Sequence, residues 1–382
     1  MTTGDYDRYD LWHLTPFEKW IYDEGVPVIT QQIIRDVYSV ETKPWERTGC
    51  SATILDLTDE PTEGSIINTQ GTTRFVYEIP PGGKFNAEKH MYEEIFFVLK
   101  GRGATTVWVE EDGPRQTFEW KEGSVFSIPL NAWHEIYNGQ GDAPARLYAA
   151  SSAPTAFNLY ASPEFVFDCP NTFPDRFDPT DETFFAGKAT KLADRFMSTN
   201  FIPDVNQVVL DRWRARGPGA NMMILMAGGH FICHVSEFPA GTYKKAHTQE
   251  YSGRGRVSGL GLPSSTAYLF LNGEGYDLQW RFGDTPGPGM EWERLDYGAG
   301  TLMSPGSAYH QHFNLSGDPS RYVVFRYGNP RYTGAGSKRQ RDEGGLNIEF
   351  EDEDPRVLET FNRELAERGV PAFVPAEAAA RD

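Results

Sequence analysis

EIPPGGKFNAEKHMYEEIFFVLKGRG, at residues 78–103, combines turn residues at both ends with a charged middle and an apolar run. In extended backbone, residues two apart point to the same face. Glu88, His90 and Glu94 have the same parity, so one extended segment can direct all three side chains at one interior point. Gly and Pro turns around apolar, β-branched and aromatic residues are typical of short strands. The stretch therefore predicts β-structure that carries a concentrated polar site.

The same pattern of short predicted strands separated by Gly and Pro turns extends in both directions along the chain. It stops in residues 151–210, which are rich in Pro, Asp and Phe and are interpreted as an ordered linker packed across two halves. It resumes over residues 221–327. Regular short strands with frequent turns favour an antiparallel barrel or sandwich. In the first half the predicted strands lie at 52–57, 73–79, 95–99, 105–109, 125–128 and 146–150.

Two segments are expected to be helical. The shorter one covers residues 16–24. The longer one, near the C-terminus, follows the surface loop predicted for GAGSKRQRDEGG at 334–345 and carries the usual start and stop signals with one apolar stripe. Its N-cap is Asp354, its N1 proline is Pro355 and its terminating glycine is Gly369. The apolar stripe consists of Leu358, Phe361 and Leu365.

A weak internal repeat organises the chain. EIPPGGKFNAEKH at 78–90 aligns with EFPAGTYKKAHTQ at 237–249, and IPLNAWHEIYN at 128–138 aligns with SPGSAYHQHFN at 304–314. VLKGRG and FLNGEG, and upstream WERTG and WRARG, match as well. Two copies of one β-rich unit predict two barrels. The expected boundaries are 1–48 for an N-terminal arm, 49–160 for the first barrel, 161–216 for the linker, 217–330 for the second barrel and 331–382 for a C-terminal extension with the helix.

The composition limits the kinds of binding partner that the chain is expected to have. The chain has 382 residues, with 36 basic and 54 acidic ones and a formal net charge of −18. Such a surface repels phosphate backbones and anionic lipid, so neither nucleic acid nor membrane is an expected partner. MTTGDYDRYD at the N-terminus lacks the basic and apolar regions of a signal peptide. Cys50, Cys169 and Cys233 form no CxxC pair, which disfavours disulfides and a Cys-rich zinc site. We expect a cytoplasmic protein.

A candidate metal site lies in the first half. His134 follows the PLNAW turn on a later strand, and with Glu88, His90 and Glu94 it offers two imidazoles and two carboxylates. Two His and one carboxylate on one face, with open positions, is the arrangement of non-haem Fe(II) oxygenases, and carboxylate-rich sets also suit Mn. The lack of thiolate argues against structural zinc. The alternative is a barrel rim carrying solvated Glu and His.

The second copy offers a reduced set. His247 takes the position of Glu88, Gln249 that of His90, and His310 that of His134. His312, two residues further on, shares a face with His310. Three histidines could bind a metal, but the carboxylate is gone. The competing interpretation is an inherited barrel whose remaining polar residues bind substrate or satisfy one another.

Other side chains near these sets have ordinary interpretations. His230 and His234 share parity before the second ligand segment and are interpreted as packing or pocket-lining residues. Tyr92, Phe96 and Val98 share parity with the first set, so they would line a largely apolar pocket suited to small organic substrates.

At this point the sequence resembles a bicupin. The first cupin motif, G-x5-H-x-H-x3-E-x6-G, fits at every spacing, with Glu88 in place of the first His, and the second motif fits with Asn131 replacing a Gly. The matching residues are Gly82, Glu88, His90, Glu94, Gly101, Gly123, Pro129, Asn131, His134 and Asn138, and in the second copy Gly241, His247, Gly273, Pro305, His310 and Asn314. The resemblance implies an all-β fold of two double-stranded jelly-roll barrels, with the N-terminal arm and the C-terminal helix packed outside, and suggests a homo-oligomer.

Within cupins, the two-barrel layout, the length and His310-Gln311-His312 are similar to gentisate-type ring-cleaving dioxygenases. Those enzymes take an intact His-x-His from their metal-bearing barrel, whereas here the pairs are Glu88-x-His90 and His247-x-Gln249. Cupins also include decarboxylases, isomerases and storage proteins.

Three functions follow as expectations. The first is a dioxygenase-like oxidoreductase with one divalent metal per chain, Fe(II) before Mn, Ni or Zn, and a small hydroxylated or carboxylated substrate, aromatic ones included. Glu88 or Glu94 would then be free to act as a catalytic base. The second is a non-oxidative metal-dependent isomerase, decarboxylase or hydrolase. The third is a non-catalytic binding protein.

Overall fold

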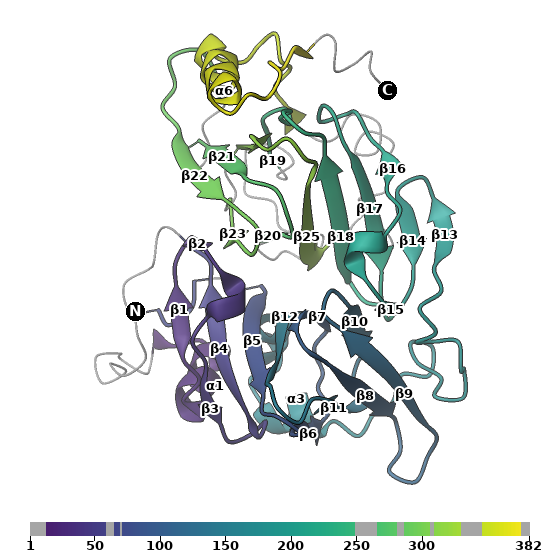
Figure 1. The fold of residues 1–382 in the computed structure, drawn as a ribbon. Helices are drawn as coiled ribbons and strands as arrows, with labels where there is room; N and C mark the ends of the chain where they lie inside the picture. The colour runs from purple at the N-terminus through teal and green to yellow at the C-terminus, as the bar shows by residue number, and fades with distance from the viewer. Residues whose placement is uncertain are drawn as a thin grey trace.

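The computed structural model describes residues 13–58, 65–68, 71–248, 266–280, 286–305, 309–329 and 346–375. Figure 1 shows two β-structures stacked on one another, the N-terminal half below and the C-terminal half above, with one helix at the top. The predicted all-β fold of two jelly-roll barrels is confirmed. Predictions for residues 1–12, for Gln249 and for the loop at 334–345 fall outside the described residues.

The first barrel is built from two sheets. The large one has the strand order β1-β4-β5-β12-β7-β10-β15 with β3 beside β4, and the small one has the order β6-β11-β8-β9. Their inward faces enclose an apolar interior that includes Phe85, Phe96 and Val98. The strands are β1 Val28–Thr30, β3 Lys43–Trp45, β4 Cys50–Asp56, β5 Thr73–Ile79, β6 Lys84–Glu88, β7 Glu94–Lys100, β8 Arg102–Trp108, β9 Arg115–Lys121, β10 Val125–Ile128, β11 Trp133–Asn138, β12 Ala145–Ser151 and β15 Phe201–Ile202.

The second barrel repeats this plan. Its large sheet has the order β13-β14-β17-β18-β25-β20-β23-β2 with β16 beside β17, and its small sheet has the order β22-β21-β24-β19-β26. The strands are β2 Ile33–Ile34, β13 Thr190–Ala193, β14 Phe196–Ser198, β16 Asp211–Arg212, β17 Ala220–Leu225, β18 Phe231–Phe238, β19 His247–Thr248, β20 Tyr268–Phe270, β21 Gly275–Gln279, β22 Glu293–Tyr297, β23 Leu302–Met303, β24 His310–Asn314, β25 Ser320–Tyr327 and β26 Leu346–Asn347.

The register of the small sheets supports the alignment of the two copies. His134 on β11 pairs with Glu88 on β6, and His310 on β24 pairs with His247 on β19. Both pairs are those that the sequence repeat places at equivalent positions. The repeat therefore marks structurally equivalent positions in the two barrels and is not a chance similarity of sequence.

The barrels exchange edge strands. Strand β2 of the N-terminal arm pairs with β23 of the second barrel, and β15 of the linker pairs with β10 of the first. Each exchanged strand is followed by a one-turn 3-10 helix, η3 Val37–Ser39 or η4 Val205–Gln207. The prediction that the arm packs outside is therefore wrong for its strands. A sheet edge has unpaired backbone groups, and these short strands satisfy them.

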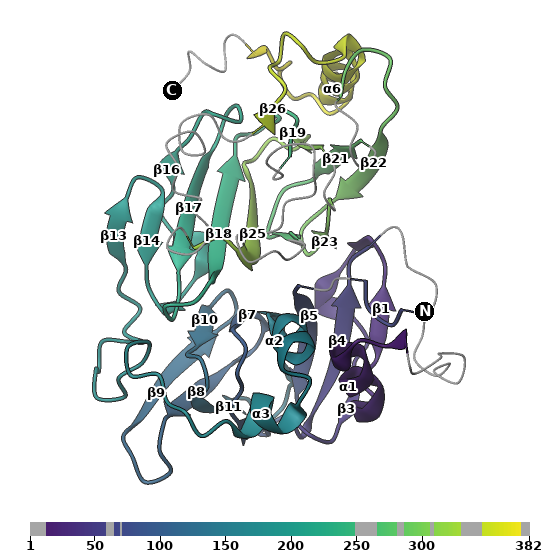
Figure 2. The same cartoon turned by 180° about the vertical axis from the view of Figure 1, so that it is seen from behind.

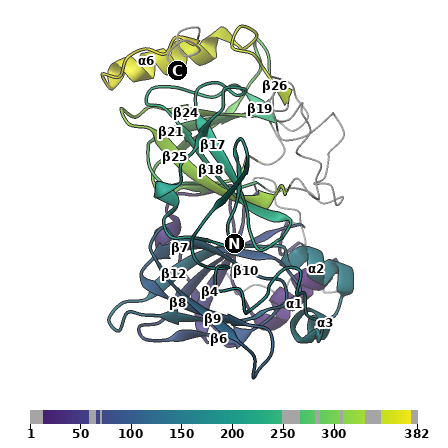
Figure 3. The same ribbon diagram turned by 90° about the vertical axis from the view of Figure 1, so that its right-hand side faces the viewer.

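The two large sheets also share one apolar core. Side chains on their outward faces, which in an isolated barrel would meet water, pack against each other between the barrels, and the rings of Tyr148 on β12 and Phe325 on β25 lie 5.9 Å apart. Figure 3 shows the two sheets facing each other along this boundary. This core includes Val76, Ile95, Phe97, Leu99, Ile224, Phe231, Cys233, Val235 and Val323.

Helices cover part of each barrel. Helices α1 Pro16–Glu24, α2 Ala153–Tyr160 and α3 Pro163–Asp168 gather on the first barrel, and α6 Pro355–Glu367 lies over the second (Figure 2). Both predicted helices are present. Asp354 caps α6 by accepting from the Arg356 amide, as expected. The buried stripe of α6 is Val357, Phe361 and Leu365, with Leu358 only partly buried, so the predicted stripe is wrong by one residue at its start.

Two further expectations concern cysteines and membranes. All three cysteines are buried and unpaired, which agrees with the prediction of no disulfide. Within the described ranges, no helix combines the length and the apolar character needed to cross a bilayer.

The contact that ties α6 to the second barrel predicts a pH dependence of stability. Glu353, just before α6, accepts hydrogen bonds from the Tyr243 hydroxyl and from Gln311 Nε2. Burial raises the pKa of Glu353 to about 7, although these bonds act in the opposite direction. A raised carboxyl pKa stabilises the fold below the unfolded-state pKa, and this contribution is lost as the pH rises through about 7. We expect a loss of about 3 kcal/mol at most.

Urea unfolding at acidic and mildly alkaline pH measures this difference. Glu353→Gln keeps the hydrogen-bonding shape without the titration, so it should lessen the fall in unfolding free energy between the two conditions. Glu351→Gln, at an exposed position two residues away, is the matched control. Equal pH dependence of the wild type and Glu353→Gln would contradict the prediction.

Candidate metal centre and a second histidine cluster

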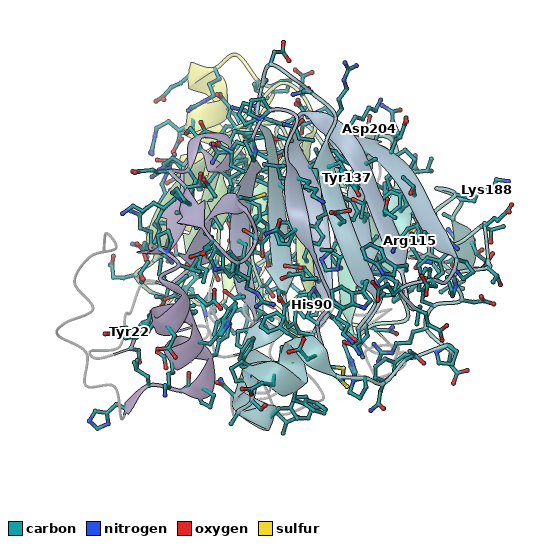
Figure 4. The ribbon with its side chains drawn as sticks, turned by 90° about the horizontal axis from the view of Figure 1, so that it is seen from below. Tyr22, His90, Arg115, Tyr137, Lys188 and Asp204 are labelled. Atoms are coloured by element: carbon teal, nitrogen blue, oxygen red, sulfur yellow. The ribbon has the colours of Figure 1, made fainter. Side chains whose placement is uncertain are left out.

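Three of the four predicted ligands of the first barrel converge. One ligand atom each from Glu88, His90 and His134 lies within 4.8 Å of the others, and none of the three is exposed. Glu88 ends β6, His90 follows two residues later, and His134 lies directly opposite Glu88 on β11. Figure 4 shows His90 between the strands of the first barrel and a covering helix. The cross-strand register thus assembles the cluster from two chain segments.

The hydrogen bonds of the two Nδ1 atoms determine which ring nitrogen of each histidine faces the cluster. His90 Nδ1 lies 2.8 Å from the Tyr92 carbonyl oxygen, and His134 Nδ1 lies 3.4 Å from that of Ala132. Since a carbonyl only accepts, each Nδ1 carries the proton, and each Nε2 keeps a lone pair. Both Nε2 atoms are buried without a hydrogen-bond partner in the described structure. Burial and the neighbouring His90 lower the pKa of His134 to about 3. Neutral imidazoles with inward lone pairs fit a divalent cation.

The carboxylate of the cluster is held in a low-dielectric setting. Burial raises the pKa of Glu88 to about 7, while His90 and Arg47 oppose the shift. Arg47 Nε lies 3.3 Å from Glu88 Oε2, and its guanidinium carbon lies 3.4 Å from the ring centre of Phe167. A cation at the cluster would favour the ionised form of Glu88 further. Sequence reasoning missed Arg47, which lies in the turn between β3 and β4.

Glu94 lies beside the cluster. It begins β7, in the large sheet, whereas Glu88 ends β6, in the small sheet, because residues 89–93 turn between them. The prediction that one extended segment carries both carboxylates is therefore wrong. Glu94 Oε2 still lies 3.4 Å from His90 Nε2, and Oε1 lies 3.5 Å from the Tyr77 hydroxyl. Glu94 is fully buried but is not part of the 4.8 Å group found among the described residues.

The site is enclosed by apolar and aromatic groups. Tyr92, Phe96 and Val98, which were expected to line it, belong to the buried core of this barrel. Helix α3 and the segment after it close one end: the Met91 amide donates to the Val166 carbonyl and Lys89 Nζ donates to the Cys169 carbonyl. Nothing in the sequence predicts this closure, because the closing residues lie more than seventy positions from Lys89 and Met91, which they contact.

The turn before His134 explains why Asn replaces Gly in the motif. Asn131 has φ 56°, a left-handed conformation that Asn tolerates better than most residues. Its amide donates to the His90 carbonyl, and its side chain donates to the carbonyls of Cys169 and Asn171. Asn131 therefore joins the turn, a ligand-bearing segment and the closing segment.

Substitution at Asn131 should separate these contributions. Asn131→Gly keeps the backbone conformation but loses two buried side-chain hydrogen bonds, so we expect a loss of about 1–3 kcal/mol. Asn131→Ala adds the strain of a left-handed alanine and should lose about 1 kcal/mol more. Urea unfolding of both variants measures the order. Asn131→Ala as stable as Asn131→Gly would contradict it.

A second cluster occupies the equivalent place in the second barrel. Ligand atoms of His247, His310 and His312 lie within 4.8 Å of one another, and all three side chains are buried. His312 Nδ1 lies 2.8 Å from Asp277 Oδ1 on β21, and the Tyr268 hydroxyl lies 2.8 Å from His310 Nε2. The predicted three residues do converge. Asp277 was missed, although its parity places it on the same interior face as its cross-strand partner His312.

The charge around the second cluster differs from that around the first. Burial lowers the pKa values of His247 and His312, and the nearby positive charge of Arg216 lowers them further, together with Lys244 in the case of His312. The field that disfavours protonation of these rings also disfavours a bound cation. Burial raises the pKa of Asp277, with Lys244 opposing.

His230 and His234 lie outside both three-residue clusters. His230 Nδ1 lies 3.3 Å from Glu93 Oε1, in a network with Arg176. His234 faces the interior of the second barrel and is buried.

Comparisons with known proteins place these clusters in context. Residues 75–151 match the family model of the cupin domain. Auxin-binding protein T85 of Nicotiana tabacum is 25% identical over 134 residues, 34% of this chain and 68% of that protein. Two structures of oxalate decarboxylase, one on its substrate binding mode and one of the Bacillus subtilis protein at pH 4.6, are 12% and 11% identical. Each covers 78% of this chain with TM-score 0.47, and 77% and 76% of its own chain.

Proposed function

We propose that this chain, whose residues 75–151 form a cupin domain, is a metal-dependent oxidoreductase with its catalytic centre in the first barrel. The observation that carries the proposal is the convergence of Glu88, His90 and His134 within 4.8 Å. Two imidazoles and one carboxylate on one side of a metal leave positions open for O2 and a substrate, and this ligand set is the one used by non-haem Fe(II) oxygenases. One Fe(II) per chain is therefore the first choice.

The different positions of Glu88 and Glu94 favour a metal held by three protein ligands over a metal held by four. Glu88 has an oxygen within the group, whereas Glu94 lies beyond it, next to His90 Nε2 and the Tyr77 hydroxyl. Bound Fe(II) would supply the redox chemistry with O2. Glu94 is then free to accept a proton from a substrate hydroxyl near the centre. Arg47, 3.3 Å from Glu88, limits the negative charge of the site.

The surroundings indicate the kind of substrate. The interior around the cluster is apolar and aromatic, with Phe85, Phe96 and Tyr92 buried in it. Such walls favour a small organic molecule, including an aromatic one, over a sugar or a phosphate ester. A hydroxyl or carboxyl group on that molecule would face the metal and Glu94.

A non-oxidative metal enzyme is the competing function, because Mn, Ni or Zn held by the same three residues could polarise a carbonyl. Turnover under strict exclusion of O2 would favour it. A binding protein without catalysis would bind a metal or a ligand and turn over nothing.

Oxygen uptake after anaerobic reconstitution tests the proposal. Protein loaded with Fe(II) should consume O2 in the presence of a suitable phenolic or enolic acid from a substrate panel. Glu94→Gln, which keeps the metal group intact, should retain Fe(II) and lose about 10²–10⁴-fold in rate. Glu135→Gln on the neighbouring strand position is the matched control. Unchanged turnover by Glu94→Gln, or metal-dependent turnover that needs no O2, would contradict it.

A further inference from the structure

The interior of the second barrel gathers positive charge around few acidic partners. Lys244 is 7% exposed, and its ammonium donates to Ser236 Oγ and to the Tyr322 hydroxyl at 2.8 Å each. Arg326 on β25 donates to the Tyr327 carbonyl. Neither side chain forms an ion pair within the described part of the chain. Asp277, a carboxylate facing this interior, is engaged by His312. Burying unpaired cations is unfavourable unless an anion joins them.

Several polar groups on the same interior face lack hydrogen-bond partners among the described residues. They are both polar atoms of the Asn221 amide, His234 Nε2 and Arg326 Nε. Asn221 is 1% exposed and His234 is 8% exposed, so bulk water does not satisfy them. An ammonium has three N–H donors, and Lys244 uses two. Each unsatisfied buried group is unfavourable by about 1–3 kcal/mol.

Strand register places these groups together. On β17 and β18, Asn221 lies opposite Ser236, the acceptor of Lys244. On β18 and β25, His234 lies opposite Val324 and is therefore diagonal to both Tyr322 and Arg326 on one face. The Lys244 Nζ also lies 5.2 Å and 4.7 Å from the ring centres of Phe238 and Tyr322. Donors and aromatic rings thus share one buried region.

We infer that the interior of the second barrel binds a small organic carboxylate between Lys244, Arg326, His234 and Asn221. A carboxylate only accepts hydrogen bonds and has about four lone-pair sites, which matches the spare N–H bonds of Lys244, Arg326 and the Asn221 amide nitrogen, though not the Asn221 amide oxygen. Its negative charge offsets the positive charges of buried Lys244 and half-buried Arg326, and its hydrocarbon part contacts Phe238 and Tyr322. Arg216 strengthens the positive field, since burial lowers its pKa only to about 10 and it stays charged at neutral pH. Burial and Arg216 lower the pKa of Lys244 to about 7, and a bound anion would favour its charged form.

This site is separate from the proposed metal centre. The first barrel presents a carboxylate and neutral imidazole lone pairs, which suit a cation, whereas the second presents cations and donors, which suit an anion. The inference stands on Lys244, Arg326 and the orphaned groups, and not on Fe(II) binding.

Calorimetric titration with benzoate, acetate and the neutral benzamide tests the inference on the full chain. We expect a carboxylate to bind, and benzamide to bind at least about tenfold more weakly than benzoate. Lys244→Met and Arg326→Met should each weaken carboxylate binding about tenfold or more. The exposed Lys121→Met is the matched control and should bind as the wild type does. His134→Ala should also bind as the wild type does, which separates this site from the metal centre.

Thermal unfolding of the variants shows whether a loss of carboxylate binding is caused by misfolding. Removing a buried, unpaired charge should leave the thermal unfolding temperature of unliganded Lys244→Met equal to or above that of the wild type. Equal affinity for benzoate and benzamide, unchanged binding by both Met variants, or no binding of either carboxylate would overturn the inference. The last result would mean that water alone satisfies these groups. Tight binding of inorganic phosphate in place of both carboxylates would overturn the carboxylate assignment.

Discussion

His134→Ala should abolish metal binding, whereas His310→Ala should leave it intact. The wild type, purified without chelator and loaded with Fe(II), is expected to hold one metal per chain in the first barrel. His134 contributes one of two buried Nε2 lone pairs that meet the Glu88 carboxylate. His310 Nε2 is already paired with the Tyr268 hydroxyl, and its cluster lies in the positive field of Arg216. Without His134, only Glu88 and His90 remain, and two protein ligands bind a metal weakly.

Elemental analysis of the wild type and both variants measures the effect directly. Metal should also raise the wild-type unfolding free energy by about 3 kcal/mol at a free concentration about 100-fold above Kd, and this gain should vanish in His134→Ala. The exposed His13→Ala is the matched control. Metal lost from His310→Ala and retained by His134→Ala would move the centre to the second barrel. Two metals per wild-type chain would show that both clusters bind.

The repeat made the cross-strand geometry of both clusters predictable. Alignment of the two copies set His247 on Glu88 and His310 on His134, and the two pairs are direct neighbours in the two small sheets. Motif spacing can encode such pairs because the residues around each member align between the copies, although a longer stretch of chain separates His247 from His310 than Glu88 from His134. Strand parity and the motif placed four ligands together in the first barrel, and three of them, Glu88, His90 and His134, lie within one group.

Parity failed where the chain changes sheets. Glu88 and Glu94 have the same parity, but the turn at 89–93 moves the chain from the small sheet to the large one. Parity is meaningful only along an uninterrupted strand. No local pattern in KHMYE marks the turn, which is held by tertiary bonds such as that from the Met91 amide to the Val166 carbonyl.

Long-range partners were also out of reach. Arg47 meets Glu88, and Lys244 meets Ser236 and Tyr322, only because the barrel brings separate turns and strands together. The strand exchange did leave a signal: Asp-Val recurs at 36–37 and 204–205 as the start of two equivalent 3-10 turns, each capped by its Asp. Extending the repeat further upstream would have found it.

The shared core between the barrels leads to the second large prediction, which is that Phe325→Ala destabilises the whole chain. Phe325 is 2% exposed and packs in the core between the large sheets, where its ring lies 5.9 Å from that of Tyr148. Truncation of a buried Phe leaves a cavity and lowers the unfolding free energy by about 3–5 kcal/mol. Because β2 and β15 each complete a sheet of the other barrel, neither barrel can unfold without stripping an edge from its neighbour.

Calorimetry and intrinsic fluorescence should therefore report one coincident transition, in the wild type and at a lower temperature in Phe325→Ala. Phe165→Ala on α3 is the matched control: that ring is 37% exposed, and its removal should change the unfolding free energy by about 1 kcal/mol or less. Two resolved transitions, with only the second barrel shifted by Phe325→Ala, would show that the barrels fold independently. In that case the exchanged strands would be attachments, and the ligand clusters of each barrel could be studied in isolation.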